Sequence, residues 1–424
     1  MTDPSTTRRG LLATTGAALL AGCTGSDTTD EQSTISAARL SDIVGDESKL
    51  VVADARPVEI QRTELAAAAQ RVRSLLSTLP LPFGSDSVPN GHIRQRLTDA
   101  AQAATDRVDE ARTAPTRLVA LESLRQARAR ARFAATGWAF VDDGLTRTTL
   151  ETELDAAVSE AESIRAEYRY LGTDPVSAAL VHGVIEQSLD AVIQHPDPGR
   201  GETSQLLTVA EWGKETETAQ AHLDAVAHLS NQFQSSLPAT AGSVEPSLSA
   251  AVETLTTEVE DRRTELPPEP TADENRLREQ LRNRLREDAV ESVDRIRQAP
   301  GPASGIIAAT DALTALFAHG RFRDLLGDGT AVSIETASAV RSTRSTAVEA
   351  IRTALDESPR PDLARPILAD MARSVLFADH GLRRISRDVR PARLDDPLTR
   401  YRAATLRARS VPTACQRTVN ALDQ

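Results

Sequence analysis

Cysteine is nearly absent from this chain of 424 residues. Only Cys23 and Cys415 occur, and Cys23 lies within the first thirty residues. Cys415 therefore has no second thiol to pair with in the remainder of the chain, which can hold no intramolecular disulfide and must be stabilised by packing. We expect the Cys415 thiol to be an inert, partly buried side chain rather than a nucleophile.

Aromatic residues are also scarce, since the chain has two tryptophans, three tyrosines and seven phenylalanines. The formal net charge is −12. These two features argue against nucleic acid as a partner, because base stacking and phosphate neutralisation both lack their usual residues. We expect Trp138 and Trp212 to act as packing or interface anchors rather than as ligand platforms.

Lysine is the third scarce residue, because all but two of the 49 basic residues are arginine. Arginine in place of lysine, combined with abundant Ala, Thr and Asp, is similar to the composition of proteins from extreme halophiles. A GC-rich genome is an alternative source of the arginine. In molar salt the screening length falls to roughly 3 Å or less, so only contact ion pairs would act between charges.

No motif in the sequence identifies an enzyme. The seven histidines stand at positions 92, 182, 195, 222, 228, 319 and 380. They form neither a Cys/His cluster nor a His-Glu-x-x-His pattern, and glycine-rich phosphate loops and Gly-x-Ser-x-Gly elbows are missing as well. The best metal candidates are His182 and Glu186, which would share one helix face at i,i+4 spacing. A routine polar contact explains that pair equally well, and we expect no metal and no cofactor.

The first 23 residues form a distinct segment. Arg8-Arg9 precedes an apolar run, Leu11 to Leu20, that is too short to span a bilayer, and the small residues Ala21-Gly22 precede Cys23. This order resembles a twin-arginine signal joined to a lipobox, as in exported lipoproteins of bacteria and halophilic archaea. The resemblance covers residues 5–23. It implies that Arg8 and Arg9 direct export, that residues 1–22 are removed, and that Cys23 becomes the lipid-bearing first residue.

The same resemblance implies a location at the outer face of the cytoplasmic membrane, held by the lipid anchor. Twin-arginine systems carry folded cargo, so folding would precede export. Residues 23–50 are predicted to be a flexible tether, because the stretch from Thr24 to Ser36 has hardly an apolar side chain. Two lipid chains on one cysteine would hold the protein stably at the membrane.

From Pro57 onward the sequence predicts consecutive amphipathic helices separated by Pro and Gly, and Val51-Val52 is the only plausible strand. The predicted helices are 57–79, 89–113, 116–141, 147–171, 175–194, 202–236, 246–265, 271–298, 303–326, 332–357, 361–387 and 391–422. Their narrow aliphatic stripes favour antiparallel neighbours in up-and-down bundles, with long coiled-coil-like hairpins as the near alternative.

The chain breakers repeat at an offset near 185 residues. The matching pairs are Leu79-Pro80 with Leu266-Pro267, Ala114-Pro115 with Ala299-Pro300, Asp143-Gly144 with Asp328-Gly329, and Pro175 with Pro359. Helices of similar length can also come into register by accident. We predict an all-α protein made of two tandem antiparallel helical bundles of about six helices each, residues 51–240 and 241–424, related by internal duplication.

The two predicted halves differ in charge. Residues 365–417 hold 12 arginines and 5 aspartates, whereas the matching stretch 181–232 holds Arg200 and Lys214 against eight acids. The basic C-terminal helices could face anionic lipid headgroups or pack against the acidic helices of the first half. Uneven drift of solvated faces is the simpler explanation.

These features favour a non-enzymatic interaction or scaffold protein of the cell envelope, with the membrane and an envelope protein as its expected partners. The alternative is an all-helical ligand- or metal-binding lipoprotein that serves uptake. Imelysin-like iron-uptake lipoproteins are similar in outline, being exported, helical and internally duplicated. Their Gly-x-His-x-x-Glu motif is absent, because the glutamate follows His182 at i+4 and no glycine stands two residues before it. A hydrolase of envelope material would require a buried carboxylate pair, which a single sequence does not reveal.

Overall fold

The computed structural model describes residues 34–44, 51–266, 276–327 and 336–424. Residues Thr34 to Gln424 form one compact unit. The predicted export arginines Arg8 and Arg9 and the predicted lipid site Cys23 lie outside the described residues, as do 24–33 and 45–50 of the predicted tether.

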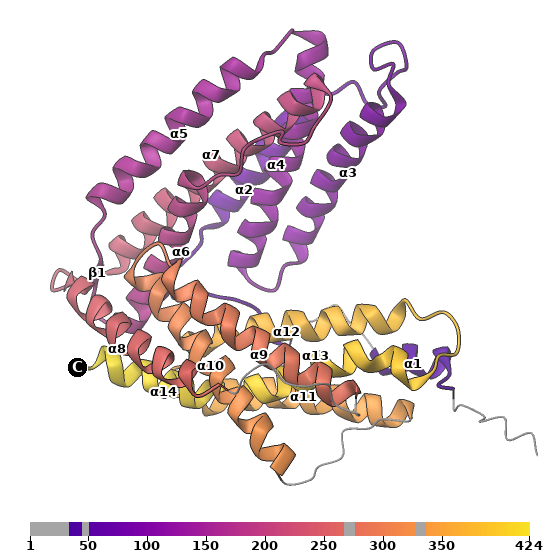
Figure 1. Cartoon of the computed structure of the whole chain (residues 1–424). Coiled ribbons are helices and arrows are strands. Elements are labelled where there is room, and N and C mark those ends of the chain that lie inside the picture. Colours follow the sequence, from indigo (N-terminus) through magenta and orange to yellow (C-terminus); the bar gives the residue numbers. More distant parts are fainter. Residues whose placement is uncertain (1–33, 45–50, 267–275, 328–335) are drawn as a thin grey trace, which may run out of the picture. The chain divides into compact units, whose positions relative to one another are not determined.

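Most of the described chain is helical (Figure 1). The elements are α1 (Ala37–Val44), α2 (Arg62–Leu76), α3 (Gly91–Thr113), α4 (Arg117–Asp142), α5 (Arg147–Glu167), β1 (Leu171–Gly172), α6 (Pro175–Ile193), α7 (Gln205–Ser236), β2 (Gly242–Ser243), α8 (Glu245–Thr264), α9 (Arg276–Arg297), α10 (Pro302–Gly327), α11 (Ala337–Glu357), α12 (Pro361–Arg383), η1 (Pro391–Leu394), α13 (Asp395–Ala408) and α14 (Val411–Leu422). The predicted all-α class is confirmed.

Several of these helices begin where the sequence supplies a cap. The side chains of Asn90, Thr116, Asp174 and Ser204 accept hydrogen bonds from the first free N–H groups of α3, α4, α6 and α7. Pro175 follows the Asp174 cap at the first position of α6, where the missing N–H costs nothing. The predicted starts therefore agree with the observed ones to within a few residues.

The helices form two bundles with the same pattern of neighbours. In the first bundle, α4 packs against α2, α3 and α7, while α5 and α6 pack against α7 and each other. In the second, α10 packs against α8, α9, α13 and α14, while α11 and α12 pack against α13 and each other. Each pair in the first bundle thus recurs in the second, with α13 and α14 together in the place of α7. The predicted arrangement of two tandem bundles is confirmed.

Two predictions about local structure are wrong. The single helix predicted over 391–422 is divided into η1, α13 and α14. Pro412 stands in the first turn of α14, where it can begin a helix but cannot continue the hydrogen-bond ladder of α13. Val51-Val52 is not a strand, and the described strands are instead β1 and β2, which pair Leu171 with Ser243 and Gly172 with Gly242.

The predicted tether is wrong for its described part, residues 34–44. Ile35 exchanges both backbone hydrogen bonds with Val389, at N–O distances of 2.8 and 3.0 Å. In α1, the side chains of Leu40, Ile43 and Val44 are buried, and the helix packs against α11 and α12. These three apolar residues share one helix face, so the segment gains enough buried surface to become ordered.

Helix α6 is the central helix of the compact unit. It packs against α5 and α7 of the first bundle and against α10 and α12 of the second. Within the described residues it is also the one helix long and apolar enough to cross a membrane. Two thirds of its apolar window is buried inside the protein (67%), as expected of a core helix that is apolar on all sides.

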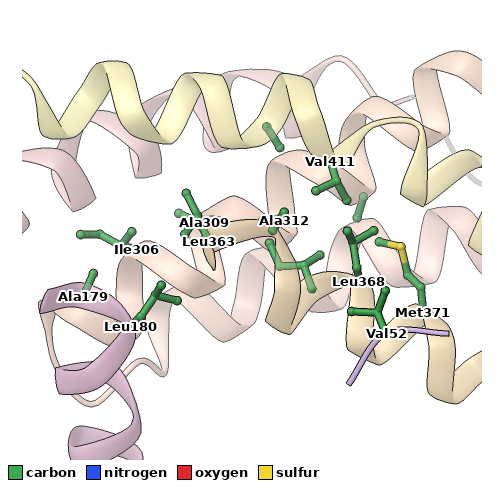
Figure 2. Close-up of a cluster of buried hydrophobic side chains, with 14 of the residues drawn as sticks. Val52, Ala179, Leu180, Ile306, Ala309, Ala312, Leu363, Leu368, Met371 and Val411 are labelled. Atoms are coloured by element: carbon green, nitrogen blue, oxygen red, sulfur yellow. The ribbon is translucent and has the colours of Figure 1, made fainter. Parts of the chain in front are cut away.

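One apolar core runs through both bundles. Figure 2 shows Ala179 and Leu180 of α6 beside Ile306 of α10, with Leu363 and Val411 of the second bundle farther along the same cluster. Because these side chains are almost fully buried, separating the bundles would expose part of this core to water.

Candidate functional site

A cavity of about 770 Å³ lies between the two bundles. Its walls are formed by α4 and α6 from the first bundle and by α10 and α12 from the second. The segment before α2 adds Asp54 and Arg56, and α3 and α9 add Arg107 and Arg295. This volume is within the range of small-molecule sites in proteins.

Equivalent positions of the two bundles line this cavity. On α4 the lining positions include Val119, Glu122, Ser123 and Gln126, and the residues 185 positions later, Ser304, Ile307, Ala308 and Asp311, line it from α10. Likewise, Val184 and Gln187 of α6 correspond to Asp370 and Arg373 of α12 at an offset of 186. The duplicated bundles therefore meet through the same surface, and the cavity lies where those surfaces face each other.

On one side of the cavity, α6 and α10 approach closely through Gly183. A Cβ atom at Gly183 would lie 2.9 Å from Ile307 Cδ1 and 3.3 Å from the backbone nitrogen of Ser304. A larger residue would force the two helices apart. The equivalent position on α12, at the offset of 186, is Ala369.

Glu186 joins the same two helices. This carboxylate is 6% exposed, and it accepts hydrogen bonds from the backbone N–H groups of Ala303 (3.1 Å) and Ser304 (2.7 Å) and from the Ser304 hydroxyl. Burial and the neighbouring Glu186 carboxylate raise the pKa of the Tyr170 hydroxyl. A carboxylate of the first bundle thus caps the N-terminus of α10 in the second, where the helix dipole favours negative charge.

Gly301 makes room for this cap. A Cβ atom there would lie 2.3 Å from Glu186 Oε1 and 2.9 Å from the Tyr170 hydroxyl. On the other side of the cavity the equivalent of Glu186 is Ala372, and α4 is capped by its own Thr116, whose Oγ1 accepts from the Val119 N–H at 3.3 Å. Among the described residues, that side has no matching cap between the bundles. There the cavity is lined by α4 of the first bundle and α12 of the second.

A second polar link joins equivalent positions directly. Asp174 and Arg360 are the residues before the first prolines of α6 and α12, and the guanidinium binds the carboxylate through two hydrogen bonds of 3.0 and 2.6 Å. Arg360 holds the pKa of Asp174 well below its usual range, and Asp174 raises the pKa of Arg360. A bidentate pair of this kind fixes orientation as well as distance.

The cavity wall includes a partly buried ion pair with unsatisfied hydrogen-bonding groups. Arg56 Nη2 donates to Asp54 Oδ2 at 3.2 Å, and the Arg56 side chain is 10% exposed. Asp54 Oδ1 and Arg56 Nε and Nη1 have no hydrogen-bond partner among the described residues. Burial raises the pKa of Asp54 and lowers that of Arg56, so each charge is costly and depends on its partner.

Five arginines and four acidic residues line the cavity. The basic side chains are Arg56, Arg107, Arg125, Arg295 and Arg373, and the acidic ones are Asp54, Glu122, Asp311 and Asp370. Arg125 Nη1 lies 2.9 Å from His222 Nδ1. Burial and Arg125 lower the pKa of His222 to about 3, so the ring is neutral near pH 7 and Nδ1 accepts this hydrogen bond. His222 therefore adds no charge beside Arg125, and burial lowers the pKa of Arg125.

His182 and Glu186, the metal candidates from the sequence, lie on the same helix but serve different partners. The His182 ring is 2% exposed and packs among Tyr168, Tyr170 and Phe233. Its Nε2 donates to the Leu171 carbonyl at 2.9 Å, so Nδ1 accepts from the Tyr168 hydroxyl at 2.6 Å. Both ring nitrogens are thereby used, and burial lowers the pKa of His182.

No group of three or more His, Cys, Asp or Glu side chains in the described parts of the chain is arranged to hold a metal ion. His182 links α6 to the strand-bearing loop and Glu186 links it to α10. The i,i+4 spacing therefore does not reflect a partner that the two side chains share.

The remaining residues singled out from the sequence are part of the core. Cys415 is completely rather than partly buried, and burial raises the pKa of its thiol to about 12. Trp212 is buried beneath the Arg147 guanidinium, 4.6 Å from the ring centre, and Trp138 packs against Phe83. Both tryptophans are packing anchors, as predicted.

The sequence did not reveal the Asp54–Arg56 pair, because the two residues precede the first helix of the bundle and match no motif. One signal for the cavity was present, namely the repeat itself. Duplicated units commonly meet through like surfaces, and the offset near 185 would have placed α4 opposite α10 and α6 opposite α12. Which charges line the space could not be inferred from the offset alone.

Comparisons with known families match each bundle separately. Residues 63–240 match the family model described as Domain of unknown function (DUF8262), and residues 245–420 match the one described as Domain of unknown function (DUF8264). The predicted division at 240/241 lies between these two ranges. No curated protein and no solved structure matches the chain.

Replacing Glu186 with Gln tests the cap that joins the bundles. The amide removes the negative charge from the α10 N-terminus and turns one acceptor into a donor that faces other donors. We expect Glu186→Gln to lower the free energy of unfolding by about 2–4 kcal/mol, measured by urea denaturation.

Asp190→Asn on the same helix is the matched control, because the Asp190 carboxylate is 32% exposed and lies 3.5 Å from Arg165. It should cost less than about 1 kcal/mol. Equal losses of unfolding free energy for the two variants would show that the Glu186 cap contributes no more to stability than the partly exposed Asp190 carboxylate.

Proposed function

We propose that this protein is a lipid-anchored, non-enzymatic binding protein of the cell envelope, exported by the twin-arginine route and held at the outer face of the cytoplasmic membrane by a lipid on Cys23. The order of the sequence features at the N-terminus supports the proposed export and lipid attachment. The twin arginines, the short apolar run and Cys23 follow each other in the sequence, and the folded unit begins at Thr34, a few residues after the proposed lipid site.

The use of polar side chains in the interior favours binding over catalysis. His182, Glu186 and Asp174 are each engaged in hydrogen bonds that hold helices together. Arg128 and Glu217, buried between α4 and α7, are bonded to each other at 2.7 Å. A general acid or base needs a proton that it can exchange with a substrate, whereas these groups are occupied with structural partners.

A second candidate function is the binding of a small anion in the cavity, as expected of a ligand-binding lipoprotein that serves uptake. The observation that favours it is the Arg56 guanidinium, which lines the cavity and has two buried nitrogens without a partner among the described residues. A carboxylate or phosphate oxygen could accept hydrogen bonds from such groups, and apolar lining residues such as Ile307 and Ile367 could contact an attached hydrocarbon part.

The lipid anchor is tested by fractionation of cells that produce the full chain. We expect the wild-type protein to sediment with membranes, to resist extraction by salt, and to be released by detergent. Mass spectrometry should find an N-terminal peptide that begins at Cys23 and carries added lipid. Cys23→Ser should lose the lipid and the resistance to salt extraction, because the sulfur is the site of attachment.

Cys415→Ser is the matched control, since it removes the only other cysteine and should leave the lipidated peptide unchanged. A Cys23→Ser protein that still resists salt extraction and has the same N-terminal mass as the wild type would refute the anchor.

Anion binding is tested by thermal unfolding with added acetate, longer-chain carboxylates or inorganic phosphate. A ligand present at 100 times its dissociation constant stabilises the folded state by about 2.7 kcal/mol, which raises the melting temperature by several degrees. We expect such a rise for the wild type and no rise for Arg56→Gln, with each variant compared with its own ligand-free melt.

The control is Arg112→Gln, which alters a 66%-exposed arginine in the last turn of α3 that does not line the cavity. It should respond to the anion as the wild type does. If Arg56→Gln and Arg112→Gln responded alike to every anion, the cavity would have no role in the binding.

A further inference from the structure

Four exposed arginines are grouped in the segment between α12 and α13. They are Arg384, Arg387, Arg390 and Arg393, and we refer to them as the basic loop. The one acid between the first and last of them, Asp388, accepts a hydrogen bond from the backbone N–H of Ala37 at 3.1 Å. The basic loop is therefore a strongly positive part of a protein whose net charge is −12.

The N-terminal part of the chain joins the folded unit at this same loop. Ile35 pairs with Val389, which lies between Arg387 and Arg390 in sequence, through backbone hydrogen bonds of 2.8 and 3.0 Å. Helix α1 follows at once and packs against α12 (Figure 1). Thr34, the first residue of the folded unit, thus stands beside the basic loop rather than elsewhere on the surface.

The length of chain before Thr34 limits how far the basic loop can lie from the proposed lipid site. Ten residues separate Cys23 from Thr34. A chain of this length spans at most about 35–40 Å when fully extended, and about 20 Å on average if it behaves as a flexible coil. A lipid on Cys23 would keep the basic loop within that distance of the membrane surface.

An exposed aromatic side chain lies on the helix that leads into the basic loop. Phe377 of α12 is 61% exposed, the most exposed of the large apolar side chains described, and the Arg400 guanidinium stacks over its ring at 4.4 Å. Phe377, His380 and Arg384 follow each other at i, i+3 and i+7, so they share one face of the helix. Aromatic rings combined with arginines are typical of protein surfaces at the membrane interface.

We propose that the basic loop and Phe377 dock against anionic lipid headgroups, so that the membrane is the partner of this face. The proposal rests on the lipid anchor of the proposed function for its geometry. Arginine suits this role because its planar guanidinium binds phosphate oxygens through two hydrogen bonds, and such contact pairs still act when salt screens longer-range attraction.

The anchor also explains how a small patch can suffice. A tether of ten residues holds the basic loop at a high effective concentration next to the headgroups, so each contact need only be weak. Docking would then orient the folded unit, with the cavity and both bundles held at a defined angle to the membrane rather than rotating freely on the tether.

The test is vesicle sedimentation of the full chain carrying Cys23→Ser, which cannot be lipidated. Residues 1–22 are common to all the variants compared, so a difference in binding between variants reports on the altered surface. We expect the Cys23→Ser chain to bind vesicles containing phosphatidylglycerol more tightly than vesicles of phosphatidylcholine, with affinity rising as KCl is diluted from molar concentration. Adding Arg384→Glu, Arg387→Glu, Arg390→Glu and Arg393→Glu should weaken binding to the anionic vesicles by on the order of tenfold or more.

The matched control changes four exposed arginines of the first bundle instead: Arg62→Glu, Arg73→Glu, Arg130→Glu and Arg200→Glu. It alters the net charge equally and should bind at least tenfold more tightly than the loop variant. A separate Phe377→Ser change should also weaken binding, and thermal melts confirm that each variant is folded.

The docking surface is overturned if the loop variant and the control bind alike, or if the Cys23→Ser chain does not prefer the anionic vesicles. These outcomes are independent of the anchor. A missing lipid on the N-terminal peptide would refute the anchor without affecting the vesicle result, and a failed vesicle experiment would leave the anchor in place.

Discussion

The buried carboxylate of Glu186 is the interaction on which the arrangement of the two bundles depends. It extends from α6 of the first bundle to the free N–H groups at the start of α10 in the second. A helix start buried without such acceptors would be unstable, and a buried carboxylate without donors would be equally costly. The first bundle thus supplies acceptors for the N–H groups of α10, and the second bundle supplies donors for Glu186. Gly183 and Gly301 leave the space for this contact.

The junction also accounts for the cavity. The bundles use equivalent surfaces, but only the α6–α10 side has the glycine and the capping carboxylate, whereas the equivalent positions on α12 hold Ala369 and Ala372. An inexact duplication has therefore produced an interface that is closed on one side and hollow on the other.

The same divergence appears inside the bundles. The helix pair α4–α7 is linked by Arg128 and Glu217, and its counterpart α10–α13 is linked by Asp311 and Arg407, with the charges exchanged between the helices.

Much of the fold could be predicted from the sequence because local signals and packing agree. The Asp174-Pro175 pair marked the start of α6, and the apolar stripe from Leu277 to Ile296 marked the buried face of α9. The errors arose where tertiary contacts decided the outcome. The sequence from Thr34 to Val44 appears too short and polar to fold alone, but it is ordered by Val389 and by packing on α12. Pro412 was a visible breaker within a strongly helical stretch.

The candidate site was less predictable, because the roles of its residues depend on partners that are distant in the sequence. His182 and Glu186 were correctly placed on one helix, but their partners, Leu171 and Ser304, come from segments that no local pattern connects. Arg56 stands out only in the folded structure, where its Nε and Nη1 atoms are buried without a hydrogen-bond partner among the described residues. The basic C-terminal stretch was visible as a charge asymmetry, and the pairing of Ile35 with Val389 now links the part of it between α12 and α13 to the proposed tether.

The proposed orientation at the membrane and the cavity between the bundles both require that the two bundles behave as one body. Calorimetry of the wild-type chain tests this requirement most directly. The account predicts a single heat-absorption peak whose calorimetric enthalpy equals its van't Hoff enthalpy, because unfolding either bundle would expose the shared core and leave Glu186 or the start of α10 unsatisfied. Two separate peaks, with one bundle remaining folded after the other has melted, would contradict it.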